Sequence, residues 1–308
     1  MPHDHHHHHH HDHIDPCAMH GRAFAIGIAL NACFVFAEIL YGIQANSLSL
    51  LADAGHNAGD VLGLFLAGGA LILSRREPSE RYTYGLQSSS IMAALANAVL
   101  LLVAVGGVGW EALTRLMHPE SSAGLTVMAV AAAGVCVNGF TAWLFMRGRE
   151  HDLNVRAAFR HMLADALIAF GVVVAGGIML KTGWKWLDPA VSLIISVIII
   201  VGTVDLLKDS LNLALHAVPE NVDLTAVRAY LAGLEGVAEV HDLHIWAMST
   251  TETALSVHLL MPGGHPGNHF IMKINESLEH DHHIGHATIQ IEVASTSEGC
   301  RLASPHVA

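Results

Sequence analysis

Two segments of this 308-residue sequence carry the pattern His-x-x-x-Asp inside long apolar runs. The first runs from His56 to Asp60 and the second from His161 to Asp165. A spacing of four places both side chains of a pair on one face of a helix. If the two faces meet, they supply two imidazoles and two carboxylates, the number and type of ligands that suit tetrahedral zinc. Magnesium and calcium sites use more carboxylate and carbonyl oxygen and less imidazole.

A lone histidine in an apolar helix is more often a packing residue than a metal ligand. Two copies of the pattern favour the metal site, because ionisable groups are costly at membrane depth and neither pair has a cation of its own. A shared divalent cation, or protons in its absence, supplies the positive charge. We therefore predict one metal site built from the two pairs.

Three further polar residues in the apolar runs are candidates for a functional role. Asp53 shares the helix face of His56, so it is either an acceptor that orients that imidazole, a vestibule charge, or a helix-entry residue near the outer interface. Glu38 and Asn97 are interpreted as transport-pathway or helix-packing groups.

The elements that must position these residues are membrane helices. The chain is 52% hydrophobic and only 14% charged, with a mean hydropathy of +0.45, whereas a soluble domain carries about 25% charged residues. A large soluble protein with buried helices is the alternative, but the chain has too little polar surface to cover six such helices. Six runs each approach the ~20 residues that a spanning helix needs: 23–43, 48–74, 87–113, 122–146, 157–181 and 187–208.

The connectors between these runs predict the topology. Those between runs 2 and 3 and between runs 4 and 5 hold seven arginines, and the other connectors hold three basic residues. Because basic loops stay on the cytoplasmic side, both termini are predicted to be cytoplasmic. Glycine pairs at 68–69, 106–107 and 176–177 are expected to let helices approach closely.

The composition changes after the six-helix domain, predicted as 22–208. Residues 209–296 have helical and alternating segments in the order α-β-β-α-β, which predicts a small cytoplasmic α+β domain, and 297–308 are predicted to be a disordered tail.

The chain begins with nine histidines in its first 13 residues. This start is either a purification tag or a native tail, 1–21, that captures metal weakly near the pore, with Cys17 and His20 extending it. No signal peptide is apparent. The four cysteines are scattered, which predicts neither a disulfide framework nor a cysteine zinc site. The formal charge of −12 argues against a nucleic-acid partner.

The motifs "SLSLLADAGHNAGD", "NVRAAFRHMLADAL" and "HDLHIWAM" make the chain resemble the cation diffusion facilitator family, most closely its bacterial zinc/cadmium exporters. The resemblance implies a six-helix homodimer in membrane lipid, with a ferredoxin-like cytoplasmic domain, that exchanges divalent metal for protons. It places the transport site on His56, Asp60, His161 and Asp165. The histidine at position 56, where some members have a carboxylate, favours zinc, with cadmium or cobalt as companions.

The resemblance also implies cytoplasmic metal ligands, at His241, His258 and Glu292, with His286 as a looser fourth. Gln290 stands where some members have a histidine ligand. His244 is not expected to join, because residues three apart in a regular strand face opposite sides. Residues 279–286, "EHDHHIGH", are either a solvated helix end or a metal site, and the loop at 75–85 has no histidine and predicts no strong site.

The predicted function is therefore proton-coupled export of divalent metal, Zn²⁺ above all, across a bacterial inner membrane. An intramembrane metalloenzyme is an alternative, but it needs a general base beside an open metal position, and no H-E-x-x-H motif is present. A membrane-bound metal sensor is the other alternative. It would bind metal without carrying it across the bilayer.

Overall fold

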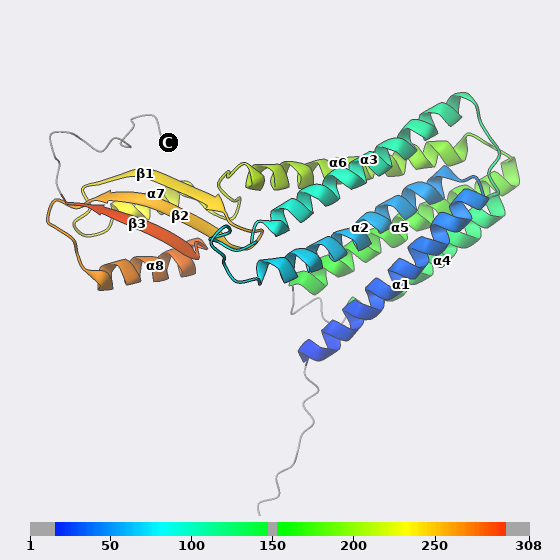
Figure 1. Cartoon of the computed structure of the whole chain (residues 1–308). Coiled ribbons are helices and arrows are strands. Elements are labelled where there is room, and N and C mark those ends of the chain that lie inside the picture. The colour runs from blue at the N-terminus through cyan, green and yellow to red at the C-terminus, as the bar shows by residue number, and fades with distance from the viewer. Residues whose placement is uncertain (1–15, 147–152, 294–308) are drawn as a thin grey trace, which may run out of the picture. The chain divides into compact units, whose positions relative to one another are not determined.

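A computed structural model describes residues 16–146 and 153–293 (Figure 1). Side chains are described from residue 27 onward, except at 153–155 and 157. Its long helices are α1 (Pro16–Gln44), α2 (Leu48–Ser74), α3 (Ser89–Met117), α4 (Gly124–Phe145), α5 (Leu153–Thr182) and α6 (Leu187–Ala214). The remaining elements are α7 (Leu224–Ala232), β1 (Glu239–Ala247), β2 (Thr253–Leu260), α8 (Asn268–His282) and β3 (His286–Glu292).

Within the described part of the chain, six helices are long and apolar enough to cross a membrane, as the sequence predicts. The two largest differences from the predicted runs are at the start of α1 and the end of α6. α1 begins at Pro16, inside the segment predicted as a tail, where proline suits a first helical turn because its missing N–H needs no partner there. α6 continues past 208 to Ala214, because no glycine or proline follows until Pro219.

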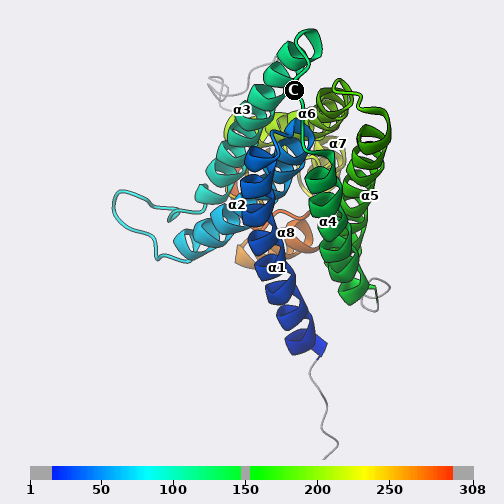
Figure 2. The same cartoon turned by 90° about the vertical axis from the view of Figure 1, so that its right-hand side faces the viewer.

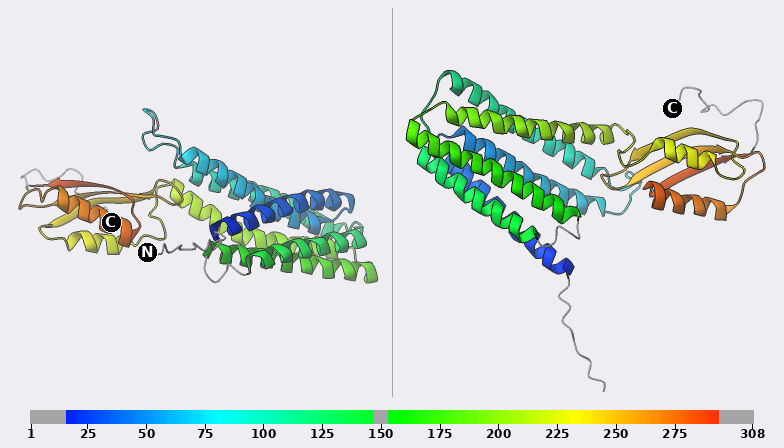
Figure 3. Two further views of the ribbon diagram at one scale, coloured as in Figure 1. Left: turned by 90° about the horizontal axis from the view of Figure 1, so that it is seen from below. Right: turned by 180° about the vertical axis from the view of Figure 1, so that it is seen from behind.

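The described residues form two compact units, the first from 16–61 and 103–200 and the second from 62–102 and 201–293. In the first unit, α4 and α5 run side by side (Figures 2 and 3). A Cβ added to Gly176 on α5 would lie 3.0 Å from the backbone nitrogen of Met128 on α4. This glycine therefore sets the close approach of the two helices.

The other glycine pairs do not have the predicted role within the chain. A Cβ built on residue 68, 69, 106 or 107 would meet no atom within 4 Å among the described residues. The expectation that these pairs bring helices together is therefore wrong for contacts inside this chain. A glycine pair shows that one face of a helix lacks side chains, but it does not show whether a neighbouring helix packs on that face.

Gly176→Ala is expected to destabilise the protein by about 1 to 3 kcal/mol, because backbone atoms of α4 would have to move. Gly177→Ala is the matched control, since its Cβ would meet only the Met128 sulfur at 3.8 Å. Thermal unfolding in detergent compares the two variants. Because alanine favours a helix more than glycine does, helix propensity cannot cause a loss in either variant. Equal losses in the two variants would contradict a specific role of the close approach at Gly176.

The second unit contains the α+β domain. Its mixed sheet has the order β1-β2-β3, with β2 antiparallel to β1 and parallel to β3. Apolar residues of α7 and α8, including Leu231 and Leu278, pack with Leu255 and Val257 of β2 in a buried core. Both helices therefore cover one sheet face, and the alternate strand residues lie on the other face.

A β-bulge in β1 changes which side chains share that other face. His241 lies opposite His258 and His244 lies opposite Ser256, so three steps along β1 correspond to two along β2. Asp242 is the irregular residue, with φ of 50°. The extra residue returns His244 to the face of His241, so the expectation that they lie on opposite faces is wrong.

Candidate metal centre

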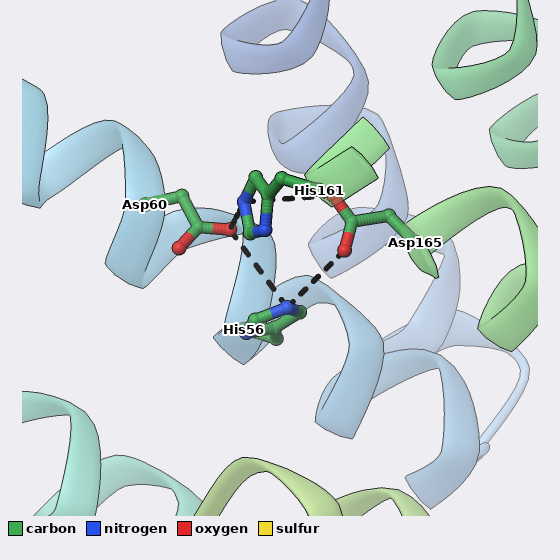
Figure 4. Close-up of side chains that lie close together, drawn as sticks. All are labelled: His56, Asp60, His161 and Asp165. Atoms are coloured by element: carbon green, nitrogen blue, oxygen red, sulfur yellow. Dashed lines mark hydrogen bonds and ion pairs between the residues drawn. The ribbon is translucent and has the colours of Figure 1, made fainter. Parts of the chain in front are cut away.

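The two His-x-x-x-Asp pairs meet inside the first unit. Figure 4 shows His56 and Asp60 projecting from α2 toward His161 and Asp165 on α5. The Nε2 atom of His161 lies 3.0 Å from Oδ2 of Asp60 and 3.7 Å from Oδ2 of Asp165. The Nε2 atom of His56 lies 3.3 Å from Oδ1 of Asp165 and 3.9 Å from Oδ2 of Asp60. Each imidazole therefore contacts both carboxylates.

The centre has a deep side and an open side. The Asp165 side chain is 1% exposed, whereas that of Asp60 is 26% exposed and that of His161 is 42% exposed. Neither oxygen of Asp165 accepts a hydrogen bond from any described residue. A buried carboxylate without hydrogen-bond donors is unfavourable, so this position requires positive charge from its surroundings.

The four side chains suit a divalent metal ion of intermediate hardness, such as zinc. One ligand atom from each of the four residues can be chosen so that all four lie within 4.8 Å of one another. Two imidazole nitrogens and two carboxylate oxygens make four ligands, which is the coordination number of tetrahedral zinc. Four protein ligands leave no position open for a catalytic water, so the arrangement suits holding a metal more than hydrolysis.

A second buried polar cluster lies beside the centre on α1 and α2. Glu38, Asp53 and Asn57 are each 0% exposed, and Asn57 Nδ2 lies 3.5 Å from Oε2 of Glu38. Asp53 accepts no hydrogen bond from a described residue, so it does not orient His56 through one. Its side chain is fully buried, and its role stays a prediction. Asn57 was not predicted, because an amide next to a metal ligand carries no distinctive pattern.

Asn97 is not a member of the four-residue group. Its side chain packs against Gly63 of α2 in the second unit, where an added Cβ would lie 2.9 Å from its Nδ2. Of the two interpretations offered for Asn97, helix packing is the one that agrees with this contact.

A second group of residues that could bind a metal ion lies on the outer sheet face. His241 Nε2 is 3.3 Å from Oε2 of Glu292, and His258 Nδ1 is 3.0 Å from Oε1 of Glu292. The three residues can bring one ligand atom each within 4.8 Å of the others. Asp242 Oδ2 also lies 3.5 Å from His258 Nε2. The sequence alone did not identify Asp242, because only the bulge turns it toward this group.

The other candidates on the sheet lie outside this group. His286 begins β3 and pairs with Ala254, about 20 Å along the strand from Glu292, and its ring contacts Tyr84. His286 is therefore not a fourth member. His244 is 51% exposed and lies 3.0 Å from Asp242 Oδ1, and Gln290 Nε2 is 3.4 Å from Glu292. The polyhistidine start, the side chains of Cys17 and His20, and the tail from 297 lie outside the described residues.

Both parts of the chain match models of known protein families. The model of the cation efflux transmembrane domain matches residues 24–213, and that of the cation efflux protein cytoplasmic domain matches residues 219–294. The chain belongs to the cation efflux family. The resemblance to cation diffusion facilitators and the predicted fold class, six membrane helices followed by a cytoplasmic α+β domain, are thereby confirmed.

The relatives of this cation efflux protein are named for metal transport. The zinc transporter ZitB of Yersinia pestis is 33% identical, over 89% of this chain and 88% of its own length. The metal cation efflux system protein CzcD of Cupriavidus metallidurans is 32% identical, over 89% and 87%. The cadmium, cobalt and zinc/H⁺-K⁺ antiporter of Bacillus subtilis is 30% identical, over 88% of each chain. Among solved structures, a metal-bound C-terminal domain of CzcD is 33% identical, covering 23% of this chain and 100% of its own, with a TM-score of 0.22.

Membership of the family establishes the general activity of this cation efflux protein. It is a multi-pass membrane protein of a family of metal efflux transporters, and it binds metal ions as the substrates of transport. Its cytoplasmic domain belongs to a class through which these transporters dimerise.

Proposed function

We propose that the protein exports Zn²⁺ from the cytoplasm in exchange for protons, by alternating access. The observation that carries this proposal is the meeting of two imidazoles and two carboxylates from α2 and α5, at a point where no described residue donates a hydrogen bond to the buried Asp165. Cadmium and cobalt are the companion substrates, as the name of the Bacillus subtilis relative suggests. Both termini lie in the cytoplasm, and the membrane is the bacterial inner membrane.

The coupling follows from the chemistry of the ligands. Zinc binds neutral imidazole and ionised carboxylate, so metal and protons compete for His56, Asp60, His161 and Asp165. Imidazole ordinarily titrates near pH 6.5, which lets the same site carry either ion at physiological pH. Metal binds from the neutral cytoplasm, and the helices then move so that the site opens to the other side of the membrane. Protons from that side help to displace the metal. The protonated site then returns.

Glu38 and Asp53 are proposed to belong to the pathway of the coupling ion. Two fully buried carboxylates, with Asn57 as their described polar neighbour, are held together more readily when a cation neutralises one of them. Glu38→Gln is expected to lower proton-driven zinc flux severalfold while zinc binding persists. Flux and equilibrium binding, measured on the same preparation, separate the two effects. Parallel losses of both would contradict a pathway role.

The sheet-face group is proposed to be a regulatory metal site formed by His241, His258 and Glu292. Metal bound there would stabilise the dimer and bias the access equilibrium, provided that one state binds it more tightly. His258→Ala is expected to remove about one bound zinc per chain and to reduce flux less than tenfold. His244→Ala, an exposed histidine of the same face, is the control. Complete loss of flux in His258→Ala would contradict a regulatory role.

Zinc flux into proteoliposomes under an imposed pH gradient tests the function. When the vesicle lumen is acidic, the protein should accumulate zinc in the lumen against the zinc concentration gradient. Collapsing the pH difference with an ionophore should stop this accumulation. Metal binding without any flux would favour the alternative of a membrane-bound sensor. Flux that ignores the proton gradient would contradict antiport but would leave metal export in place.

A further inference from the structure

The start of α2 is bound by a side chain from another helix. Asp188, in the first turn of α6, accepts hydrogen bonds from the hydroxyls of Ser47 and Ser49, each at 2.6 Å. It also accepts from the backbone N–H of Leu48 at 2.7 Å and from that of Ser49 at 3.4 Å. A single carboxylate therefore has four donors from the segment that begins α2.

The chemistry of a helix N-terminus explains this contact. The first N–H groups of a helix have no partner within the helix, and negative charge is favourable there. Ser47 supplies a local cap by accepting from the N–H of Leu50 at 3.3 Å, while its hydroxyl proton points to Asp188. Asp188 is only 2% exposed, so it acts as a buried anionic cap from another helix.

This cap connects the two helices that carry the four candidate ligands, because α6 follows α5 directly in the chain and Asp188 of α6 binds the start of α2. α5, which carries His161 and Asp165, ends at Thr182, and residues 183–186 lead directly into α6. α2, which carries the other pair, begins at Leu48, about 12 Å along the helix from His56. Asp188 thus ties the start of α2 to the α5–α6 hairpin and limits sliding or rotation of one ligand pair relative to the other.

Two neighbouring hydrogen bonds involve the connector between α1 and α2 and not the start of α2 itself. Arg115 Nη1 donates to the carbonyl of Asn46 at 3.0 Å, and the N–H of Ala123 donates to the carbonyl of Ala45 at 3.0 Å. These bonds keep the α1–α2 connector in place when the cap is weakened. They do not bind the first N–H groups of α2, which are the groups that Asp188 engages.

We propose that Asp188 is a positioning residue for the transport site, which sets the spacing of the four ligands and thereby the preference for zinc over the larger cadmium ion. This inference rests on the proposed function. A tetrahedral zinc site needs its nitrogen and oxygen ligands about 2.0–2.2 Å from the metal. Small shifts of α2 along its axis would lengthen some of these distances and would be tolerated better by the larger ion.

The test compares zinc and cadmium transport in full-length variants in proteoliposomes. Asp188→Asn replaces one acceptor oxygen by an NH₂ group, which would face the four hydrogen-bond donors at the start of α2. We expect the zinc KM to rise about tenfold and the zinc-to-cadmium preference to fall severalfold. Ser49→Ala, which removes one donor, should shift both values in the same direction by a smaller amount, and Ser49→Thr should restore them. Ser192→Ala is the control on α6, since that buried hydroxyl has no hydrogen-bond partner among the described residues.

The outcomes distinguish positioning from stability alone. If Asp188→Asn and Ser49→Ala lower the unfolding temperature but leave the zinc KM and the zinc-to-cadmium ratio unchanged, the inference is overturned. Failure of Ser49→Thr to restore the ratio would overturn it as well. If the wild-type protein carries neither ion, the proposed function itself fails. The two failures are therefore separable.

Discussion

Asp165→Asn is expected to reduce zinc transport by at least about 100-fold and to remove most of the thermal stabilisation that zinc gives the protein. Removing a group that merely supports a ligand already costs 10- to 100-fold in metal affinity, and Asp165 is placed to be a ligand itself. Asparagine keeps the shape of the side chain, so the packing of this buried position is retained. What is lost is the negative charge that lies between the two imidazoles.

Thermal unfolding with and without zinc measures the second effect. A ligand present at 100 times its Kd stabilises the folded state by about 2.7 kcal/mol, and the variant should lose most of this. Asp205→Asn is the matched control, because Asp205 lies on α6 with a side chain that is 73% exposed. If Asp165→Asn retained the wild-type flux, a four-ligand site would be ruled out.

His56→Asp is expected to change which metals are carried. The variant site would hold one imidazole and three carboxylates, and oxygen-rich sites favour harder ions such as Mn²⁺. The new carboxylate would lie beside Asp165, whose oxygen is 3.3 Å from the imidazole that it replaces. We expect zinc flux to fall more than about tenfold and the manganese-to-zinc ratio to rise by a similar factor.

A panel of metals in the same flux assay provides the measurement. His118→Asp is the control, because it makes the same chemical change at an exposed histidine after α3. Equal effects of both variants would mean that overall charge, and not the ligand set, sets the preference. An unchanged ratio in His56→Asp would show that this imidazole does not bind the metal.

Much of the architecture could be predicted from the sequence, because long apolar runs allow few structures. The spacing of His161 and Asp165 places them on one helix face, and the cost of burying their charge predicts a partner face, which α2 supplies. The order of elements in the C-terminal domain followed from the change between helical and alternating patterns. The role of the four residues as metal ligands is still a proposal.

Other features depend on contacts that no local pattern encodes. The bulge at Asp242 changes the face of every residue before it, and neither its place nor its effect on His244 follows from strand periodicity. His286 has suitable chemistry, but it lies at the other end of β3 from Glu292. The cap formed by Asp188 joins segments about 140 residues apart, so only the fold reveals it.

Zinc K-edge X-ray absorption tests the central claim, a single metal site shared by α2 and α5. The sample would lack residues 1–15 and carry His241→Ala and His258→Ala, so that the polyhistidine start and the sheet-face group do not contribute zinc. We predict one zinc per chain, bound by two imidazole nitrogens and two carboxylate oxygens, and its loss when Asp165→Asn is added. A zinc signal that survives Asp165→Asn unchanged, or that contains no imidazole, would contradict the account.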